Sequence, residues 1–249
     1  MSKRDAVYVE NLWASYGTFK AVRGISFTIP PGEVFGFIGP NGAGKSTTLR
    51  ILSTLKAPAF GQAQIDGHCV VKDTMKVRRK IGYVPDSFGV YEDLTTQDYL
   101  EFFAAAYKLP LDQRTHTIGD ALELVDLTDK RGSNVESLSR GMKQRLSIAR
   151  VLLHDPAVLL LDEPASGLDP RARIEMRELL KSLREMGKTI LISSHILHEL
   201  AHLCTRIGII DKGRMVVEGS LDDIYKRLGV HQTVQIHICL LYTSPSPRD

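Results

Sequence analysis

The chain has 249 residues, of which 43% are apolar and 24% charged, and its formal net charge is +3. This composition is typical of a globular protein with a buried core. The basic residues are scattered, so we expect no nucleic-acid partner. Three cysteines form no C-x-x-C pair, which suits a reducing cytosol and argues against a disulfide framework. The first residues lack the apolar stretch of a signal peptide, and no apolar run reaches the ~18 residues of a membrane span.

Short apolar runs alternate with helical patterns along the chain. The runs "EVFGFIG" (33–39), "VLLLD" (158–162) and "TILISS" (189–194) predict buried strands, each followed by a helix. This alternation indicates an α/β fold with a parallel sheet covered by helices. After the first strand, a helix should place Leu49, Leu52 and Leu55 on one face.

The middle of the chain differs, because from about Thr95 to His154 it shows helical patterns and no convincing strand. Thr95 and Asp98 have the spacing of a capping box at the first of these helices. Strands resume directly after this stretch, so we expect a helical insertion in the core rather than a separate domain.

A later helix carries clear boundary signals. Asp169 fits its N-cap, Pro170 its first turn and Gly187 its C-terminal exit. Its expected buried stripe consists of Met176, Leu179, Leu180, Leu183 and Met186.

The last twenty residues break the pattern. A plausible strand, "TVQIHI", is followed by "CLLYTSPSPRD", which is rich in Ser and Pro. This ending resembles a peptide translated from sequencing adapter at the ends of metagenomic fragments. We expect that the natural chain was longer, that the tail 229–249 is truncated, and that its end "CLLYTSPSPRD" is not biological; a disordered native tail is the alternative.

The loop "GPNGAGKST" satisfies G-x-x-x-x-G-K-[ST] between a predicted strand and a predicted helix. Its glycines let backbone N–H groups converge on phosphate oxygens at a helix N-terminus. Lys45 is expected to reach the β- and γ-phosphates, and Ser46 to ligate Mg²⁺. The predicted nucleotide-binding residues are Gly39, Pro40, Asn41, Gly42, Ala43, Gly44, Lys45, Ser46 and Thr47.

The strand "VLLLDEP" (158–164) ends in two carboxylates. Asp162 stands where the second magnesium-holding acid of a P-loop enzyme belongs. Glu163 points the other way and could polarise the attacking water. A carboxylate that caps a helix is the structural alternative for either residue.

A third motif, "SLSRGMKQR" (137–145), begins a helix in the insertion. With the glycine loop and "VLLLDEP", it makes the chain resemble the ATP-binding subunit of an ABC (ATP-binding cassette) transporter. "LSRGMKQ" is similar to that family's signature LSGGQ, with Arg140 and Met142 as departures, while Ser139 and Gly141 are kept. The likeness covers about residues 5–228, and the motifs stand in the family's order.

The resemblance implies a P-loop (RecA-like) parallel-sheet core with N-terminal antiparallel β elements and an inserted helical subdomain. It divides the chain into a first core part (1–86), the insertion with the signature (87–154), a second core part (155–228) and the tail (229–249). Cofactors implied are ATP and Mg²⁺, with the signature residues Ser139 and Gly141 acting on the partner's nucleotide.

Further roles follow from the resemblance. Tyr16 in "ASYGTF" is similar to the aromatic that stacks on adenine, with Phe19 as the second candidate and core packing as the alternative. The "SGLD" loop (166–169), with Asp169, is similar to the loop that crosses to the partner subunit. His195, directly after "TILISS", is similar to the switch histidine that donates to the γ-phosphate. We expect catalysis by Glu163, His195 and Lys45.

The segment "HELAH" (198–202) matches H-E-x-x-H, the zinc pattern of helix-borne metalloprotease sites. Glu199 also stands where the ABC family often has an acid after the switch histidine. We therefore interpret the zinc pattern as incidental, and a zinc peptidase would be recognised by metal analysis.

One departure concerns the boundary stretch "IGYVPDSFGVYEDLT" (81–95), where the family normally has a glutamine that touches Mg²⁺ and water. Here the residue is Asp86, which adds a third carboxylate beside Asp162 and Glu163. It could ligate Mg²⁺ directly, and repulsion should raise the pKa of at least one of the three. We expect altered metal dependence with activity retained.

The leading hypothesis is an ATPase that dimerises around Mg-ATP and drives export through a separate membrane permease. Its partners would be that permease and a second nucleotide-binding subunit, either an identical copy or a paralogue. Phe88, Val90 and Tyr91 form the candidate docking surface, with insertion core as the alternative. The chain would be cytoplasmic and peripheral on the inner face of the membrane. A single-cassette ATPase of iron–sulfur assembly is the alternative function.

Overall fold

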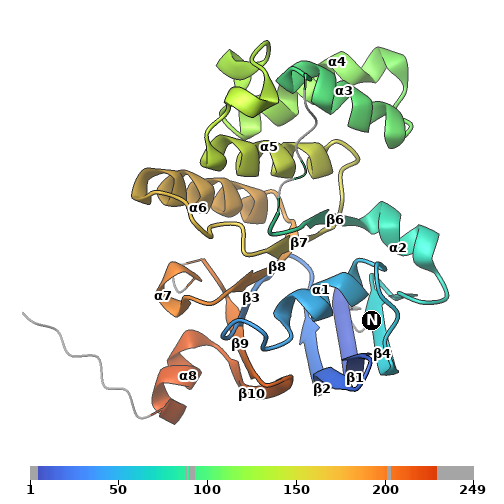
Figure 1. Cartoon of the computed structure of the whole chain (residues 1–249), viewed down its shortest axis with the longest axis vertical. Helices are drawn as coiled ribbons and strands as arrows, with labels where there is room; N and C mark the ends of the chain where they lie inside the picture. Colours follow the sequence, from blue (N-terminus) through green and yellow to red (C-terminus); the bar gives the residue numbers. More distant parts are fainter. Residues whose placement is uncertain (1–4, 88, 90–92, 201–202, 229–249) are drawn as a thin grey trace, which may run out of the picture.

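A computed structural model describes residues 5–87, 89, 93–200 and 203–228, with the backbone alone for 198, 199 and 225–228 (Figure 1). It contains two sheets with helices around them. The predicted strand "TVQIHI" and the tail 229–249 lie outside the described residues.

An antiparallel sheet is built from the N-terminal part of the chain. The strands β1 (Val7–Tyr16), β2 (Phe19–Ile29), β4 (Phe60–Ile65) and β5 (His68–Cys69) lie in the order β2-β1-β4-β5. In β1 the buried residues are Val7, Val9, Leu12 and Ala14, and the pairing register shifts between Val9 and Leu12. One face of this sheet is therefore buried, as alternation along a strand requires.

The central sheet has six strands in the order β10-β9-β3-β8-β7-β6. Their bounds are β3 (Val34–Ile38), β6 (Ile81–Val84), β7 (Val158–Asp162), β8 (Thr189–Ser194), β9 (Arg206–Asp211) and β10 (Arg214–Gly219). β10 pairs antiparallel with β9, and every other pairing is parallel. Every residue of β3, β7 and β8 is buried. The three predicted strands and the predicted α/β fold are confirmed.

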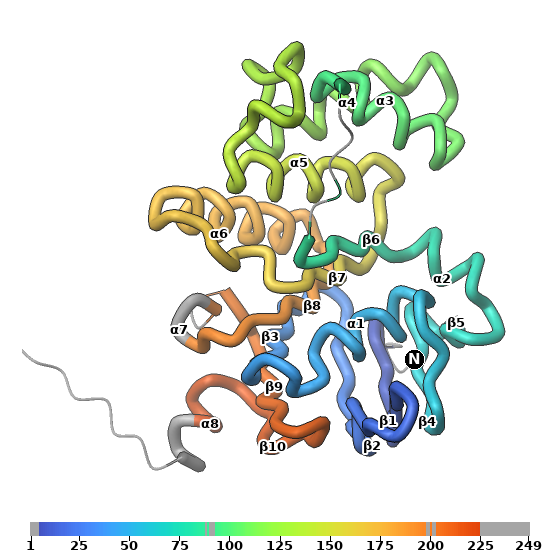
Figure 2. The backbone as a smooth tube through the Cα atoms, viewed as in Figure 1, coloured from blue at the N-terminus to red at the C-terminus, as the bar shows by residue number. Residues whose placement is uncertain are grey.

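Eight α-helices complete the described chain. They are α1 (Lys45–Leu52), α2 (Thr74–Lys80), α3 (Thr96–Ala106), α4 (Leu111–Leu124), α5 (Arg140–Leu152), α6 (Pro170–Glu185), α7 (Leu197–Leu200) and α8 (Leu221–Leu228). Two short 3₁₀ turns, Thr128–Lys130 and Val135–Ser137, lie between α4 and α5. Figure 2 shows α3, α4 and α5 gathered at one end of the molecule, with the antiparallel sheet at the other end.

Two hydrophobic clusters lie on the sheet. One joins Tyr99, Leu100 and Ile118 of the insertion to Leu159 and Ile190 of the central strands. The other cluster joins the antiparallel sheet and α1 to those buried residues of the central strands that the first cluster does not include. The insertion therefore shares its apolar core with the sheet, because its helix α5 contacts β6 on one side and α3 and α4 on the other.

Two predicted apolar faces need correction. The helix after the glycine loop ends at Leu52, and Thr54 has a left-handed φ of 64°, so Leu55 leaves the helix and is 62% exposed. In α6 the capping roles of Asp169 and Gly187 and four residues of the stripe are confirmed. Met186 lies at the C-cap and is 60% exposed, because the helix has already turned away from the core.

The capping box at α3 gives a stability prediction. Thr95 Oγ1 accepts from the Asp98 backbone N–H, and the Asp98 carboxylate accepts from the Thr95 N–H. Thr95→Ala should lower the free energy of unfolding by about 1 kcal/mol, because the Asp98 N–H loses its acceptor and the Asp98 carboxylate loses the Thr95 hydroxyl as a donor. Urea denaturation measures this change.

Thr115→Ala is the matched control, since Thr115 is exposed within α4 and the change favours helix. Equal losses in the two variants would show that the box adds nothing to stability.

Candidate active site

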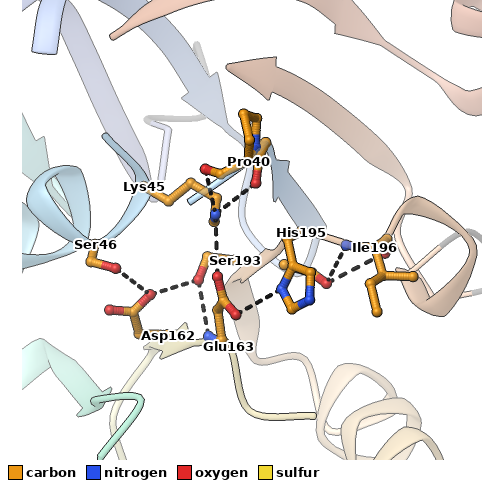
Figure 3. Close-up of polar contacts among 10 residues, drawn as sticks. Pro40, Lys45, Ser46, Asp162, Glu163, Ser193, His195 and Ile196 are labelled. Atoms are coloured by element: carbon orange, nitrogen blue, oxygen red, sulfur yellow. Dashed lines mark hydrogen bonds and ion pairs between the residues drawn. The ribbon is translucent and has the colours of Figure 1, made fainter. Parts of the chain in front are cut away.

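The central strands end at one edge of the sheet, and three chemistry-bearing segments follow them there. The glycine loop follows β3, Glu163 follows β7 and His195 follows β8. Parallel strands put their carboxyl ends at the same edge, so residues far apart in sequence meet (Figure 3).

The glycine loop turns directly into α1. Gly44 is the helix N-cap with a φ of 109°, and a Cβ there would lie 2.6 Å from the Ala21 carbonyl oxygen, so only glycine fits. On Gly42 a Cβ would enter open space beside the loop. This backbone can approach a ligand closely, and the first-turn N–H groups of α1 face outward from its end.

The side chain of Lys45 is 4% exposed and fully engaged within the site. Its ammonium donates to the carbonyl oxygens of Gly39 at 2.7 Å and Pro40 at 3.1 Å. It also forms an ion pair with Glu163 Oε1 at 3.2 Å. Burying a charge is costly unless it is paired, so these three acceptors stabilise the ammonium.

Asp162 is nearly buried at the end of β7. Its Oδ1 accepts from the hydroxyls of Ser193 at 2.7 Å and Ser46 at 3.0 Å. Burial raises the pKa of this carboxyl, the two hydroxyls lower it, and the carboxylates of Asp86 and Glu163 raise it further.

Glu163 joins the lysine to the histidine. Its Oε2 lies 2.9 Å from His195 Nδ1 (Figure 3). Because an ionised carboxylate only accepts, Nδ1 carries the hydrogen of this contact. The opposite nitrogen, Nε2, then donates to a phosphate only when the ring is an imidazolium.

The residues present fit Mg²⁺ and a triphosphate. Mg²⁺ binds through one or two carboxylates together with waters and phosphate oxygens, and Ser46 and Asp162 offer adjacent hard oxygens. Within the described ranges no group of three or more His, Cys, Asp or Glu residues could hold a metal. His198 and Glu199 have no described side chain and His202 lies outside the described residues, so the zinc interpretation stays a prediction.

Tyr16 lies at the tip of the β1–β2 hairpin and is 46% exposed. Burial raises the pKa of its hydroxyl, but the nearby polar groups of Thr47, in the glycine loop, and of Arg50 outweigh this effect and lower the pKa. The Lys56 ammonium lies 4.1 Å from the ring centroid. The ring is thus held beside the loop as an exposed stacking surface, while Phe19 is 58% exposed.

Asp86 is exposed and lies close enough to Asp162 and Tyr83 to raise the pKa of both, after burial as the larger cause. The proposed docking residues Phe88, Val90 and Tyr91 lie outside the described residues.

Ser139, Gly141 and Asp169 form a separate group, in which the N-termini of α5 and α6 meet. Ser139 caps α5 by accepting from the Met142 N–H, and Asp169 caps α6 by accepting from the Ala172 N–H. A Cβ on Gly141 would lie 2.7 Å from Ala172 Cβ, so the helices approach too closely for a side chain. These residues line a cavity of about 530 Å³, and no residue of the glycine loop lies in its wall.

The first departure in the signature has a definite place. The Arg140 guanidinium packs on Gly167 of the "SGLD" loop, where an added Cβ would lie 2.7 Å from its central carbon. The signature and this loop are therefore neighbours within one chain.

Sequence patterns missed Ser193, Arg50 and Lys56. Ser193 belongs to no motif, although two consecutive serines at the end of a buried strand could have indicated a polar residue of the site. Its link to Asp162 depends on strand register, which the sequence does not show. The contacts of Arg50 and Lys56 with Tyr16 depend on how the hairpin sits beside α1.

The glycine loop follows β3, and the paired carboxylates follow β7, which is separated from β3 in the sheet by one strand, β8. This arrangement on a parallel sheet defines a P-loop nucleoside triphosphatase. Comparison with known proteins is more specific. The family model described as "ABC transporter" matches residues 22–166. The chain belongs to the ABC transporter family and has the features of its ATP-binding, ATP-hydrolysing subunit.

Two curated relatives are similar over most of their length. The linearmycin resistance ATP-binding protein LnrL of Bacillus subtilis (strain 168) is 39% identical, over 92% of this chain and 74% of that protein. The Nod factor export ATP-binding protein I of Paraburkholderia xenovorans (strain LB400) is 40% identical, over 86% and 71%.

Among solved structures, CbiO1 of Clostridium perfringens, described as part of the ABC transporter complex CbiONQ, superposes with a TM-score of 0.82. It is 30% identical and covers 91% of this chain and 92% of its own. An ATP-binding subunit of another ABC transporter gives a TM-score of 0.80 at 32% identity, over 90% of this chain and 94% of its own. No helix of the described part of the chain is long and apolar enough to cross a membrane.

The position of Asp86 gives a prediction on metal dependence. Asp86→Gln should shift the Mg²⁺ and Mn²⁺ activation curves of ATP hydrolysis relative to each other, because it removes one carboxylate near Asp162. Activation curves measured with each metal test this, and Asp112→Gln, on the exposed first turn of α4, is the control. Unchanged curves for Asp86→Gln would place this carboxylate away from the metal.

Proposed function

We propose that this chain dimerises head to tail around two Mg-ATP molecules and drives export through a separate membrane permease. The second subunit is an identical copy or a paralogue. The names of the relatives support the export direction, since one belongs to Nod factor export and another to linearmycin resistance. The alternative of an iron–sulfur assembly ATPase is not favoured, because the two relatives are named for export and resistance and CbiO1 for a transporter complex.

The cluster of Lys45, Glu163 and His195 is the observation that carries this proposal. Phosphate oxygens that enter the glycine loop compete with Glu163 for the Lys45 ammonium. Nucleotide binding thereby frees one carboxylate oxygen, which accepts a proton from the attacking water as general base. His195, which directly follows β8, holds the other carboxylate oxygen in place.

The residues Ser46, Asp162 and Asp86 would hold Mg²⁺, which supplies charge neutralisation on the phosphate oxygens. The loop backbone binds the phosphates, and the Tyr16 ring stacks on the adenine. These groups bind and orient the nucleotide within one chain.

Ser139 and Gly141 of the partner subunit's signature would complete each site. Both lie at the N-terminus of α5, whose partial positive charge favours a phosphate by about 0.3–2 kcal/mol. Splitting the site between chains makes ATP the link that closes the dimer, and hydrolysis releases it. We propose that residues 87–154 act as the subdomain that carries this motion from the core parts, 1–86 and 155–228.

A cavity of about 1360 Å³ between the insertion and the core supports the permease contact. We propose that a cytoplasmic segment of the permease docks there, which keeps the chain cytoplasmic and peripheral at the inner face of the membrane. The cavity combines apolar side chains with charges of both signs, as a reversible protein interface does. Its lining includes Met75, Arg79, Leu109, Glu123, Leu124, Leu152, Met186 and Lys188.

Glu163→Gln tests the hydrolytic part of the proposal. Turnover should fall about 10²–10⁴-fold, as for loss of a general base, and an ATP-bound dimer should accumulate. Phosphate release and gel filtration in Mg-ATP measure both effects. Glu178→Gln, on the exposed side of α6, is the control. A Glu163→Gln protein that stays monomeric in Mg-ATP would count against the dimer.

The docking cavity gives a second test. Met75 is 63% exposed on its wall, and Met75→Glu should prevent co-purification with the proposed permease. A buried carboxylate in an apolar contact costs binding energy, while ATP hydrolysis by the isolated subunit should be unchanged. Val216→Glu, at an equally exposed residue of β10, is the control. Normal co-purification of Met75→Glu would place the interface elsewhere.

A further inference from the structure

Ser193 is a fully buried side chain in the site that no sequence motif includes. It lies in β8, where the parallel register pairs it with Asp162 of β7. Figure 3 shows its hydroxyl between the Asp162 carboxylate and the backbone of Glu163.

This hydroxyl joins two consecutive acidic residues. It donates to Asp162 Oδ1 at 2.7 Å and accepts from the Glu163 backbone N–H at 2.9 Å. A hydroxyl has one hydrogen, and a carboxylate can only accept. Donation to Asp162 therefore fixes the rotation of the Ser193 hydroxyl and leaves a lone pair directed at the Glu163 N–H. The two hydrogen bonds strengthen each other because both polarise the same oxygen.

The backbone of Glu163 requires such support. Its φ is 48°, in the left-handed region that residues with a Cβ occupy at a cost in free energy. From this conformation its carboxylate reaches both Lys45, at 3.2 Å, and His195, at 2.9 Å. A relaxed backbone at Glu163 would turn the carboxylate away from both partners.

We propose that Ser193 is a positioning residue that holds the Glu163 backbone in its left-handed conformation and so aims the carboxylate at the attacking water. This inference rests on the proposed role of Glu163 as general base. Ser193 acts through Glu163, and Asp162 keeps the Ser46 hydroxyl as a donor when Ser193 is replaced. Loss of the Ser193 hydroxyl should therefore reduce the rate of the chemical step and leave ATP binding intact.

Ser193→Ala tests this directly. The kcat for ATP should fall about 10- to 100-fold, the range expected when a buried N–H loses its only acceptor and the base is misplaced. The KM for ATP and the affinity for a fluorescent ATP analogue with Mg²⁺ should change less than about twofold, the split typical of an interaction that matters only in the transition state.

Thr189→Ala is the matched control. Thr189 lies at the other end of β8, is also buried, and its hydroxyl accepts from the Gly32 N–H at 2.9 Å. Both variants should lose similar stability in thermal unfolding, yet Thr189→Ala should keep the wild-type kcat. Equal losses of kcat in both variants would reduce the role of Ser193 to general stability.

Two further substitutions test whether the hydroxyl group or the volume of the Ser193 side chain matters. Ser193→Thr keeps a hydroxyl and should recover most of the rate. Ser193→Cys keeps a similar volume but offers only a weak donor and acceptor, so it should behave like Ser193→Ala. The inference is overturned if the cysteine variant keeps the wild-type rate.

The combination with Glu163→Gln shows whether Ser193 acts through Glu163. In that background Ser193→Ala should slow turnover no further, because residues that act as a unit are not additive. A further tenfold loss would contradict the inference and leave the proposed function standing. A Glu163→Gln protein with the wild-type rate would instead overturn the proposed function itself.

Discussion

The buried ammonium of Lys45 is the charge on which the arrangement of the site depends. At 4% exposure it needs compensating groups, and the Gly39 and Pro40 carbonyls and the Glu163 carboxylate provide them. This need draws the end of β7 to the loop after β3. Any triphosphate bound in the loop would meet the same ammonium, so the ion pair and the nucleotide are competing partners of one charge.

The neighbouring carboxylates of Asp162 and Glu163 have different hydrogen-bond partners. Asp162 is held by two hydroxyls and faces Ser46, whereas Glu163 turns to the opposite side through its left-handed backbone and meets His195. Consecutive residues at a strand end point in opposite directions, which separates their environments. Two carboxylates can therefore stand side by side in the chain and still have different partners.

The position of the signature region against α6 depends on close packing. Gly141 lets α5 approach Ala172 of α6, and Arg140 lies on Gly167 of the loop that leads into α6. The insertion also shares one hydrophobic cluster with the central sheet. The insertion is thereby in contact with the loop that follows Glu163, within one chain.

The sequence by itself determined the elements and motifs that local chemistry specifies. The glycine loop, the apolar strand ending in Asp162 and Glu163, and the capping box of Thr95 and Asp98 are recognisable because each depends on residues close together in the chain. Amphipathic periodicity predicted the buried residues correctly within helices but not at helix ends. Leu55 and Met186 continue the pattern but lie beyond the last helical turn, where the chain changes direction.

Tertiary structure alone decided the contacts that cross between strands and layers. The bond from Ser193 to Asp162 requires the register of β7 against β8, and the Lys56 ammonium reaches the Tyr16 ring only once the hairpin lies beside α1. Strand order and register follow from packing summed over the whole core, so no short stretch of sequence contains them.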